Sequence, residues 1–208
     1  MLVSVLLPVY NAAATLPVAL ESIRRQRHGE LECVALDDGS SDGSLALLER
    51  AAREDARFKV IACEHRGIVV ALNTGLEHCH GEYVARMDAD DIMHSQRLGA
   101  QCAWLAAHPE LAGVGCHVRS FPRRGLSERR LEYERWLNSL AAPEDIARDF
   151  WVECPLAHPT LMLRRAVFQR FAYSDAGWPE DYDLLARLRE AGQTLGIVPR
   201  RLLGWRDS

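Results

Sequence analysis

The chain has 208 residues, a length typical of a single domain that buries a sizeable apolar core. Hydrophobic residues make up 48% of it and charged residues 26%, which excludes a mostly disordered, collagen-like or low-complexity protein. The formal net charge is −4, whereas a general nucleic-acid binder is usually clearly basic, so we predict no nucleic-acid partner.

Targeting features and cysteine usage favour a reduced, cytoplasmic protein. Residues 1–8 lack the basic region and the long apolar stretch of a secretory signal. No apolar run approaches the ~20 residues that cross a bilayer. The six cysteines are scattered without a C-x-x-C pair, and Cys33, Cys63 and Cys116 lie inside apolar runs. We interpret these three as small core residues.

Short apolar runs alternate with helical patterns through the first part of the chain. Buried strands are predicted at 2–9, 31–36, 58–63, 83–87 and 111–121. Between them the sequence predicts a helix capped by Thr15, a second opened by Ser41 or Asp42, and two more at 68–79 and 95–107. This order predicts an α/β fold: a Rossmann-like, doubly wound and mostly parallel sheet with helices on both faces. Ligands bind such sheets beyond the carboxyl ends of the strands.

After residue 119 the alternation is lost, and we expect a mixed C-terminal part of the same domain. Helices are predicted at 126–140, 143–150, 165–171 and 179–191, and short strands at 160–163, 194–198 and 202–205.

Six arginines and three glutamates are interleaved between residues 119 and 135. The pattern favours a solvated helix laced with ion pairs. A second interpretation is a surface for an anionic acceptor or an anionic membrane.

The first acidic loop follows the strand predicted at 83–87. Asp88, Asp90 and Asp91 lie within four residues, and ionised carboxylates so close together repel one another. Mg²⁺ or Mn²⁺ held with a diphosphate would offset this repulsion. The alternative is a solvated acidic turn that caps the helix near Ser95. The position at the ligand-binding edge of the sheet favours the metal site.

The second acidic loop begins with Asp37 and Asp38 at the end of the strand predicted at 31–36. The Gly, Ser and Asp residues that follow are typical of a turn into a helix. Two adjacent aspartates at a strand end are not needed for that turn, and such a carboxylate can accept hydrogen bonds from a base edge or a ribose. Both interpretations stay open on the local sequence.

Five segments together resemble family-2 glycosyltransferases of the GT-A fold. They are VSVLLPVYNA (3–12), DDGSSDGS (37–44), HRGIVVALNTGL (65–76), GEYVARMDADDI (81–92) and WPEDYDLLARL (178–188). The resemblance is close over 3–115 and looser over 155–205. It implies an inverting transferase that moves a sugar from a nucleotide-diphosphate donor to an acceptor hydroxyl. It also implies a single GT-A domain over 1–208, with a donor-binding half at 1–116 and an acceptor-side half at 117–208.

The resemblance also implies a donor site. Its residues would be Pro8, Tyr10 and Asn11 beside the nucleoside, Asp37 or Asp38 on the base (most often uracil), Arg66 and Asn73 in the donor pocket, Asp88 at the ribose or diphosphate, and Asp90, with Asp88, at the metal. A divalent ion there would stabilise the departing nucleoside diphosphate.

For catalysis the resemblance points to Asp181 of the Glu180–Asp181 pair as the general base. An acceptor hydroxyl has a pKa far above 7, so a carboxylate that takes its proton accelerates attack, typically by ~10² to 10⁴. From the residues alone, ordinary acid enrichment in the first turn of a helix is the favoured interpretation of this pair. His158 and Trp178 are weaker acceptor-side candidates; a loop histidine and a core or rim tryptophan are the alternatives.

We therefore expect a metal-dependent transferase for polysaccharide or glycoconjugate synthesis, acting on a saccharide or lipid-linked acceptor at or near the inner face of a membrane. Family members often continue with further acceptor-side sequence, whereas this chain ends at Ser208. A sugar nucleotidyltransferase is a weaker alternative because the loop at 10–14 has no Gly or Lys to hold a triphosphate. A catalytically silent nucleotide-sugar-binding module is the third.

Overall fold

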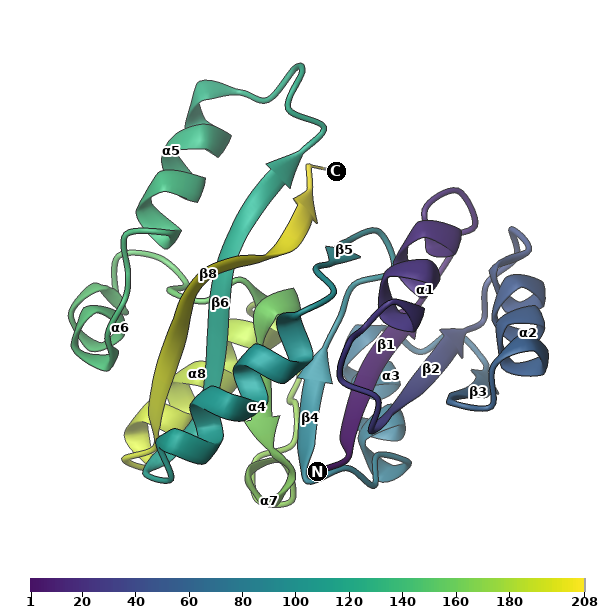
Figure 1. Ribbon diagram of the computed structural model, residues 1–208, viewed down its shortest axis with the longest axis horizontal. Helices are drawn as coiled ribbons and strands as arrows, with labels where there is room; N and C mark the ends of the chain where they lie inside the picture. The colour runs from purple at the N-terminus through teal and green to yellow at the C-terminus, as the bar shows by residue number, and fades with distance from the viewer. Residues whose placement is uncertain (208) are drawn as a thin grey trace.

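An eight-stranded sheet in the order β3-β2-β1-β4-β7-β6-β8-β5 runs through the computed structural model, which describes residues 1–207 (Figure 1). Its first half is made of β1 (Val3–Val9), α1 (Leu16–Arg24), β2 (Leu31–Asp38), α2 (Ser44–Glu54), β3 (Phe58–Cys63), α3 (Ile68–Glu77) and β4 (Tyr83–Arg86). Strand β1 pairs in parallel with β2 and with β4, and β2 pairs in parallel with β3. The predicted parallel, doubly wound half is confirmed.

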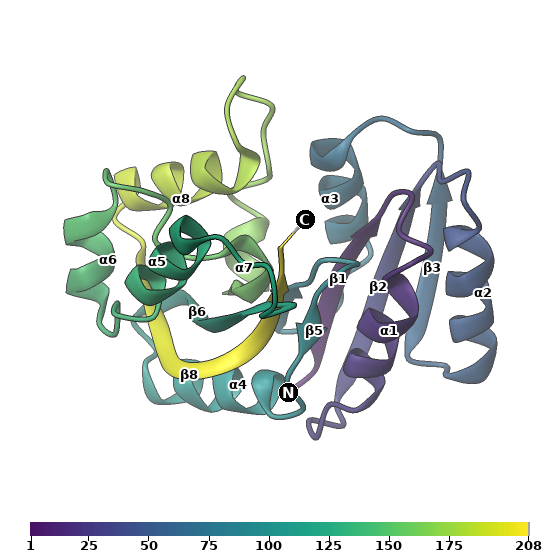
Figure 2. The same cartoon turned by 90° about the horizontal axis from the view of Figure 1, so that it is seen from above.

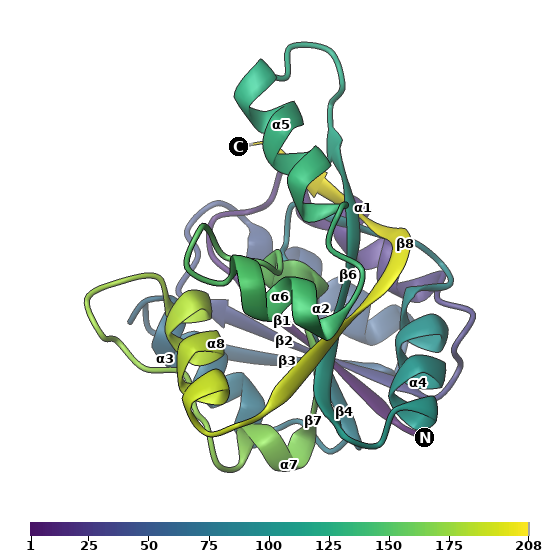
Figure 3. The same ribbon diagram turned by 90° about the vertical axis from the view of Figure 1, so that its left-hand side faces the viewer.

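The second half is mixed, as predicted. It contains β5 (Ile92–Met93), α4 (Arg97–Ala107), β6 (Leu111–Phe121), α5 (Glu128–Leu137), α6 (Pro143–Asp149), a 3-10 turn (His158–Thr160), β7 (Met162–Arg164), α7 (Arg165–Phe168), α8 (Glu180–Glu190) and β8 (Thr194–Arg206). Strand β7 is antiparallel to both β4 and β6, while β6 and β8 are parallel. In Figure 3, β6 and β8 run side by side toward α5.

Two local predictions were wrong, and a third is confirmed only in part. Helix α2 begins at Ser44 after Gly43, whose φ of 94° suits glycine, so neither Ser41 nor Asp42 is its N-cap. Thr15 is the N-cap residue of α1, as predicted, but its side chain makes no capping bond to the helix. The two short strands predicted near the C-terminus are one strand, β8, whose pairing with β6 is irregular around Pro199.

Two apolar layers cover the sheet, one on each face. Buried residues of α1, α2 and α4, such as Leu20, Leu48 and Leu98, belong to one core cluster. Those of α3, α6, α7 and α8, such as Leu72 and Leu184, belong to the other. Figure 2 shows α1 and α4 on the opposite side of the sheet from α3 and α8. The predicted helices on both faces are confirmed.

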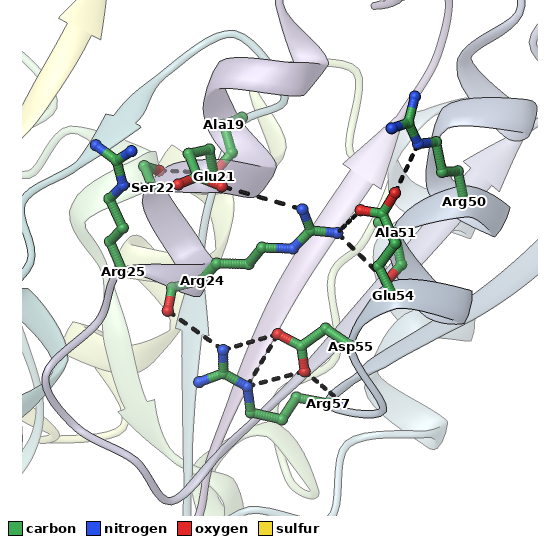
Figure 4. Close-up of polar contacts among 10 residues, drawn as sticks. All are labelled: Ala19, Glu21, Ser22, Arg24, Arg25, Arg50, Ala51, Glu54, Asp55 and Arg57. Atoms are coloured by element: carbon green, nitrogen blue, oxygen red, sulfur yellow. Dashed lines mark hydrogen bonds and ion pairs between the residues drawn. The ribbon is translucent and has the colours of Figure 1, made fainter.

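The arginines on the outer side of α1 and α2 are used for structure. Arg24 Nη2 lies 2.9 Å from Glu54 Oε2 and also donates to the carbonyl of Ala51 (Figure 4). Arg57 pairs with Asp55 at 2.7 Å and donates to the carbonyl of Arg24. Such partly exposed pairs contribute little stability each, but they join α1 to α2 and to the turn before β3.

The cysteines are free thiols. Cys33 and Cys116 are buried, as predicted, whereas Cys63 at the end of β3 is only partly buried. Within residues 1–207, no helix has the length and apolar character needed to cross a bilayer.

Glu32 is a buried carboxylate that joins three strands and supports an acid-stability prediction. Burial alone would raise its pKa, but hydrogen bonds from Lys59 Nζ, Ser4 Oγ and the His80 N–H lower it from 4.5 to about 2. A carboxyl with a lowered folded-state pKa stabilises the fold above its unfolded pKa, and this contribution disappears as the pH falls from 4.5 to about 2.

We expect Glu32→Gln to lower the free energy of unfolding at pH 7 by on the order of 3 kcal/mol. The difference from the parent should shrink as the pH falls toward 3, and chemical denaturation at several pH values measures it. Glu77→Gln, at an exposed position of α3, is the control and should be neutral. A constant difference across the range would contradict the assignment.

Candidate active site

The carboxyl ends of β1, β2 and β4 open onto a cavity of about 420 Å³, which we call the donor cavity. Six of the residues predicted for the donor site line it: Pro8, Tyr10, Asn11, Asp38, Asp88 and Asp90. Parallel strands end at one edge of a sheet, so loops far apart in the chain converge there. Arg206, from the end of β8, completes the lining.

The loop after β1 is fastened to the loop after β2. Asn11 has a φ of 47°, a left-handed conformation that asparagine tolerates. Its Oδ1 accepts from the Ser41 N–H at 2.9 Å, and its own N–H donates to Ser40 Oγ at 3.0 Å. The Tyr10 ring, about half exposed, stacks on His65 with centroids 4.0 Å apart. The stacked pair forms a flat wall beside the cavity.

Asp37 and Asp38 have different surroundings. Asp38 accepts from the backbone N–H groups of Arg66 and Gly67 at 2.9 and 3.0 Å, so it holds the loop after β3. Asp37 is 2% exposed; its Oδ2 accepts from Ser40, and its Oδ1 has no hydrogen-bond partner among residues 1–207. Asp38 lines the cavity, whereas Asp37 has a carboxylate oxygen, Oδ1, that could still accept a hydrogen bond.

Two predicted donor residues lie elsewhere. The Arg66 side chain is exposed and does not line the cavity. The Asn73 side chain donates from Nδ2 to the Tyr173 carbonyl and accepts at Oδ1 from the Tyr173 N–H, at 2.9 and 3.0 Å. Asn73 therefore fastens α3 to the segment before α8, and the structure does not bring its amide to the donor cavity.

Asp88, Asp90 and Asp91 each offer one carboxylate oxygen, and these oxygens lie within 4.8 Å of one another. Asp91 is 1% exposed; its Oδ1 accepts from the Arg206 N–H at 2.7 Å, and its Oδ2 has no partner among the described residues. Burial, together with the charge of Asp88, raises the pKa of Asp91 to about 8 and raises that of Asp90.

This arrangement fits a divalent cation better than a solvated turn. A buried carboxylate with an unpartnered oxygen is costly without a cation or a proton. The turn also does not cap α4, whose N-cap is Gln96. Three carboxylates beside an open cavity are a donor set suited to Mg²⁺ or Mn²⁺.

The sequence analysis missed Arg86, a buried cation at the end of β4. Arg86 is 4% exposed, its Nη1 pairs with Asp88 Oδ1, and its Nε has no hydrogen-bond partner among residues 1–207. The sequence signal for Arg86 was its charge, because it lies inside the apolar run that leads into the acidic loop.

We expect Arg86→Met to lower the free energy of unfolding by about 3 kcal/mol, because it leaves Asp88 unpaired beside two further carboxylates. Arg86→Lys keeps the positive charge, and its free energy of unfolding should fall clearly less than that of Arg86→Met. Urea denaturation of the metal-free proteins compares the two variants, and equal losses would show that the charge is unimportant there.

A second cavity, of about 540 Å³, lies where the starts of α5 and α8 meet the end of β8; we call it the acceptor-side cavity. Asp181 lines it, together with the aromatic side chains of Tyr133, Tyr182 and Trp205. Asp181 Oδ1 accepts from the Tyr182 N–H at 2.8 Å, and its Oδ2 has no hydrogen bond among residues 1–207. Burial raises the pKa of Asp181, and the nearby charge of Asp88 adds to the effect.

The other acidic residues of the first turn of α8 face different partners. Asp183 is buried and pairs with Arg187 at 2.7 Å, so it is structural. Glu180 Oε1 lies 3.6 Å from His158 Nδ1, and burial raises the pKa of Glu180. Asp181 is therefore the first-turn carboxylate presented to the acceptor-side cavity.

His158 and Trp178, the weaker candidates, differ in exposure. His158 is 8% exposed, bonds through Nε2 to the Tyr173 hydroxyl at 2.9 Å and lines neither cavity. Burial, with the charge of Arg86, lowers the pKa of His158 well below 6.5, so the ring is neutral at pH 7. Trp178 is 44% exposed and packs edge-on against Tyr182, at the rim.

The end of β8 contributes consecutive residues to the two cavities. Successive side chains of a strand point to opposite faces, and Trp205 lines the acceptor-side cavity while Arg206 lines the donor cavity. Arg206 Nε also donates to the Asp90 carbonyl at 2.8 Å. Figure 2 shows the C-terminal end of the chain running between the two halves of the fold. The acidic loop and Asp181 thus flank one strand end.

Residues 4–171 match the family model described as glycosyl transferase family 2. The chain belongs to this family. The match spans every element from β1 to α7, and so includes both acidic loops of the donor cavity. The family resemblance stated from the sequence is confirmed.

Curated relatives agree with the assignment. The chain is 31% identical over 196 residues to the putative glycosyltransferase EpsE of Bacillus subtilis, covering 91% of this chain and 67% of EpsE. It is 29% identical over 204 residues to the amylovoran biosynthesis glycosyltransferase AmsE of Erwinia amylovora, covering 96% of this chain and 74% of AmsE.

Solved structures show the same GT-A fold. S. aureus TarS 1-349 in complex with UDP superposes with a TM-score of 0.81 at 21% identity, covering all of this chain and 61% of that one. The mannosyltransferase PcManGT of Pyrobaculum calidifontis, in complex with GDP-Man and Mn²⁺, has a TM-score of 0.74 at 24% identity, over 95% of this chain and 54% of that one. This chain thus spans less than two thirds of either solved structure.

Proposed function

We propose that this protein transfers a sugar from a nucleotide-diphosphate donor in the donor cavity to a hydroxyl of an acceptor beside Asp181, with inversion at the anomeric carbon. One observation carries the proposal: the carboxylate cluster and Asp181 lie on the two sides of a single strand end, in two adjoining cavities. A donor and an acceptor bound there would meet beside that strand end, where the two cavities adjoin.

The donor would lie along the carboxyl edge of the sheet. The stacked pair of Tyr10 and His65 offers an aromatic wall for the nucleoside, and Asn11 and Pro8 border it. Asp37 Oδ1, buried and unpartnered, or Asp38 would accept from the base. The complex of TarS with UDP supports a uridine donor, whereas that of PcManGT with GDP-Man keeps guanosine as the alternative.

Asp88 and Asp90 would hold Mg²⁺ or Mn²⁺, with Asp91 closing the set. The ion would neutralise charge on the leaving diphosphate. Arg206 adds a positive side chain on the same cavity, and its hydrogen bonds to Asp90 and Asp91 fix the acidic loop. The complex of PcManGT with Mn²⁺ supports a divalent ion in this fold.

Asp181 would act as the general base. As the acceptor oxygen attacks the anomeric carbon, its proton passes to Asp181, the bond from carbon to phosphate oxygen breaks, and the nucleoside diphosphate leaves. The raised pKa of Asp181 makes its carboxylate a stronger base than that of an exposed aspartate. Direct displacement by one base inverts the carbon.

We further propose that residues 1–116 bind the donor and that residues 117–208 bind the acceptor, with Arg206 as the residue that crosses from the second part to the donor cavity. The relative AmsE, named for amylovoran biosynthesis, favours a polysaccharide product. We place the reaction in the cytoplasm, at the inner face of a membrane if the acceptor is lipid-linked.

The test is release of nucleoside diphosphate from a panel of UDP-, GDP- and dTDP-sugars, with saccharide and lipid-linked acceptors. We expect one donor class to be consumed with Mn²⁺ or Mg²⁺ present, and NMR of the product should show the inverted anomer. Retained configuration would remove the single-base mechanism. Tight donor binding without turnover on any acceptor or on water would favour a silent binding module.

A further inference from the structure

The acceptor-side cavity has features that restrict its ligand beyond what the proposed transfer requires. Besides Asp181 and the three aromatic side chains, two consecutive arginines of α5, Arg129 and Arg130, line it. Glu153 is the other charged lining residue; its side chain is exposed and accepts from the Cys154 N–H at 3.0 Å. The two arginines differ in how they are held.

Arg130 is fixed in place. Its guanidinium lies 3.7 Å from the centre of the Trp205 ring, and Nε donates to Ser120 Oγ at 3.1 Å. Nη2 donates to the Arg206 carbonyl at 3.3 Å. This cation orders the Trp205 ring and joins α5 to the strand end between the two cavities.

Arg129 is exposed, and it forms no ion pair with another residue in the described range 1–207. Two other arginines of the same region are paired: Arg123 with Glu134 at 2.8 Å, and Arg135 with Glu128 at 2.7 Å. No carboxylate among residues 1–207 lies within ion-pair distance of Arg129. The ion-paired helix expected from the sequence therefore describes part of the arginine-rich region, and the arginine at the cavity is left for another anion.

We propose that the acceptor is an anionic saccharide, a sugar that carries a phosphate, diphosphate or carboxylate group bound by Arg129. This inference rests on the proposed function. A guanidinium matches phosphate and carboxylate oxygens with two parallel hydrogen bonds. The rings of Tyr133, Tyr182 and Trp205 provide apolar walls for a sugar ring, and Asp181 receives the proton of its hydroxyl.

The test observes binding at the cavity directly. The indole N–H resonance of Trp205, assigned with Trp205→Phe, is followed by NMR while sugars are added to protein saturated with UDP and Mn²⁺. The probes are 1-phosphates, uronic acids, decyl-diphosphate-linked sugars and methyl glycosides of glucose, galactose and mannose. The first three classes separate phosphate, carboxylate and lipid-linked diphosphate as the source of the charge.

We expect at least one anionic probe to bind at least tenfold more tightly than the methyl glycoside of the same sugar. Arg129→Gln should remove that preference, because it removes the charge that distinguishes the two probes. Arg124→Gln, at an exposed arginine of the same region that does not line the cavity, is the matched control and should keep the preference.

Equal binding of the charged and neutral probes, binding of none of them, or a preference that survives in Arg129→Gln would overturn the inference. The UDP titration in the same samples separates this failure from failure of the proposed function. UDP bound with Mn²⁺ but no anionic preference rejects only the anionic acceptor, whereas absence of binding by UDP, GDP and dTDP alike rejects the donor site.

Discussion

Asp181→Asn should lower the rate of sugar transfer by about 10²- to 10⁴-fold while leaving the affinity for the nucleotide unchanged. The amide has nearly the same shape as the carboxylate, but it cannot take the acceptor proton. Asp181 lines the acceptor-side cavity and not the donor cavity, so its loss should leave the nucleotide's contacts in place. Transfer kinetics and calorimetric nucleotide titration measure the two effects separately.

The same residue predicts the acidic limb of the pH profile. A base acts only when deprotonated, and burial raises the pKa of Asp181 above the ordinary 3.8. Activity should therefore fall, as the pH is lowered, at a pH higher than an exposed aspartate would give, and the residual activity of Asp181→Asn should lack that limb. Asp175→Asn, at an exposed position before α8, is the control. Full transfer in Asp181→Asn would remove the base assignment.

Asp90→Asn should weaken Mn²⁺ binding in the presence of UDP by about 100-fold or more. Substitution of a residue that only hydrogen-bonds to a metal ligand can weaken metal binding by up to about 100-fold, and loss of a direct ligand should cost at least as much. Electron paramagnetic resonance of free Mn²⁺ measures this without any turnover. Asp175→Asn is again the matched control.

The metal-free stability of Asp90→Asn separates loss of the site from misfolding. Removing one of three carboxylates that lie within 4.8 Å of one another relieves repulsion. The variant should therefore unfold at the same temperature as the parent or a higher one. Unchanged Mn²⁺ binding would exclude Asp90 as a ligand, and a large fall in melting temperature would show that the carboxylate supports the fold.

The first half of the fold could be predicted because its pattern is local. Each buried strand is one apolar run, and the loops after them carry the polar residues that line the donor cavity, from Tyr10 to Asp90. The second half depends on pairings between distant segments. Strand β7 has only three residues and lies between β4 and β6, which no periodicity in the sequence reveals.

Particular residues explain the other differences. Pro199 followed by Arg200 and Arg201 is typical of a turn, yet β8 passes through these residues with irregular pairing to β6. That continuity brings Trp205 and Arg206 to the two cavities. The roles of Asn73, His158 and Arg86 depend on partners far along the chain or on burial, which their local sequence does not encode.

The most direct test of the donor site is a calorimetric titration of UDP, GDP and dTDP into the protein, with and without Mn²⁺. We predict that one nucleotide, UDP under the proposed function, binds tightly with Mn²⁺ and weakly without it. Nucleotide affinity that is the same with and without Mn²⁺, or no binding of any of the three nucleotides, would contradict a metal-assisted donor site at Asp88 and Asp90.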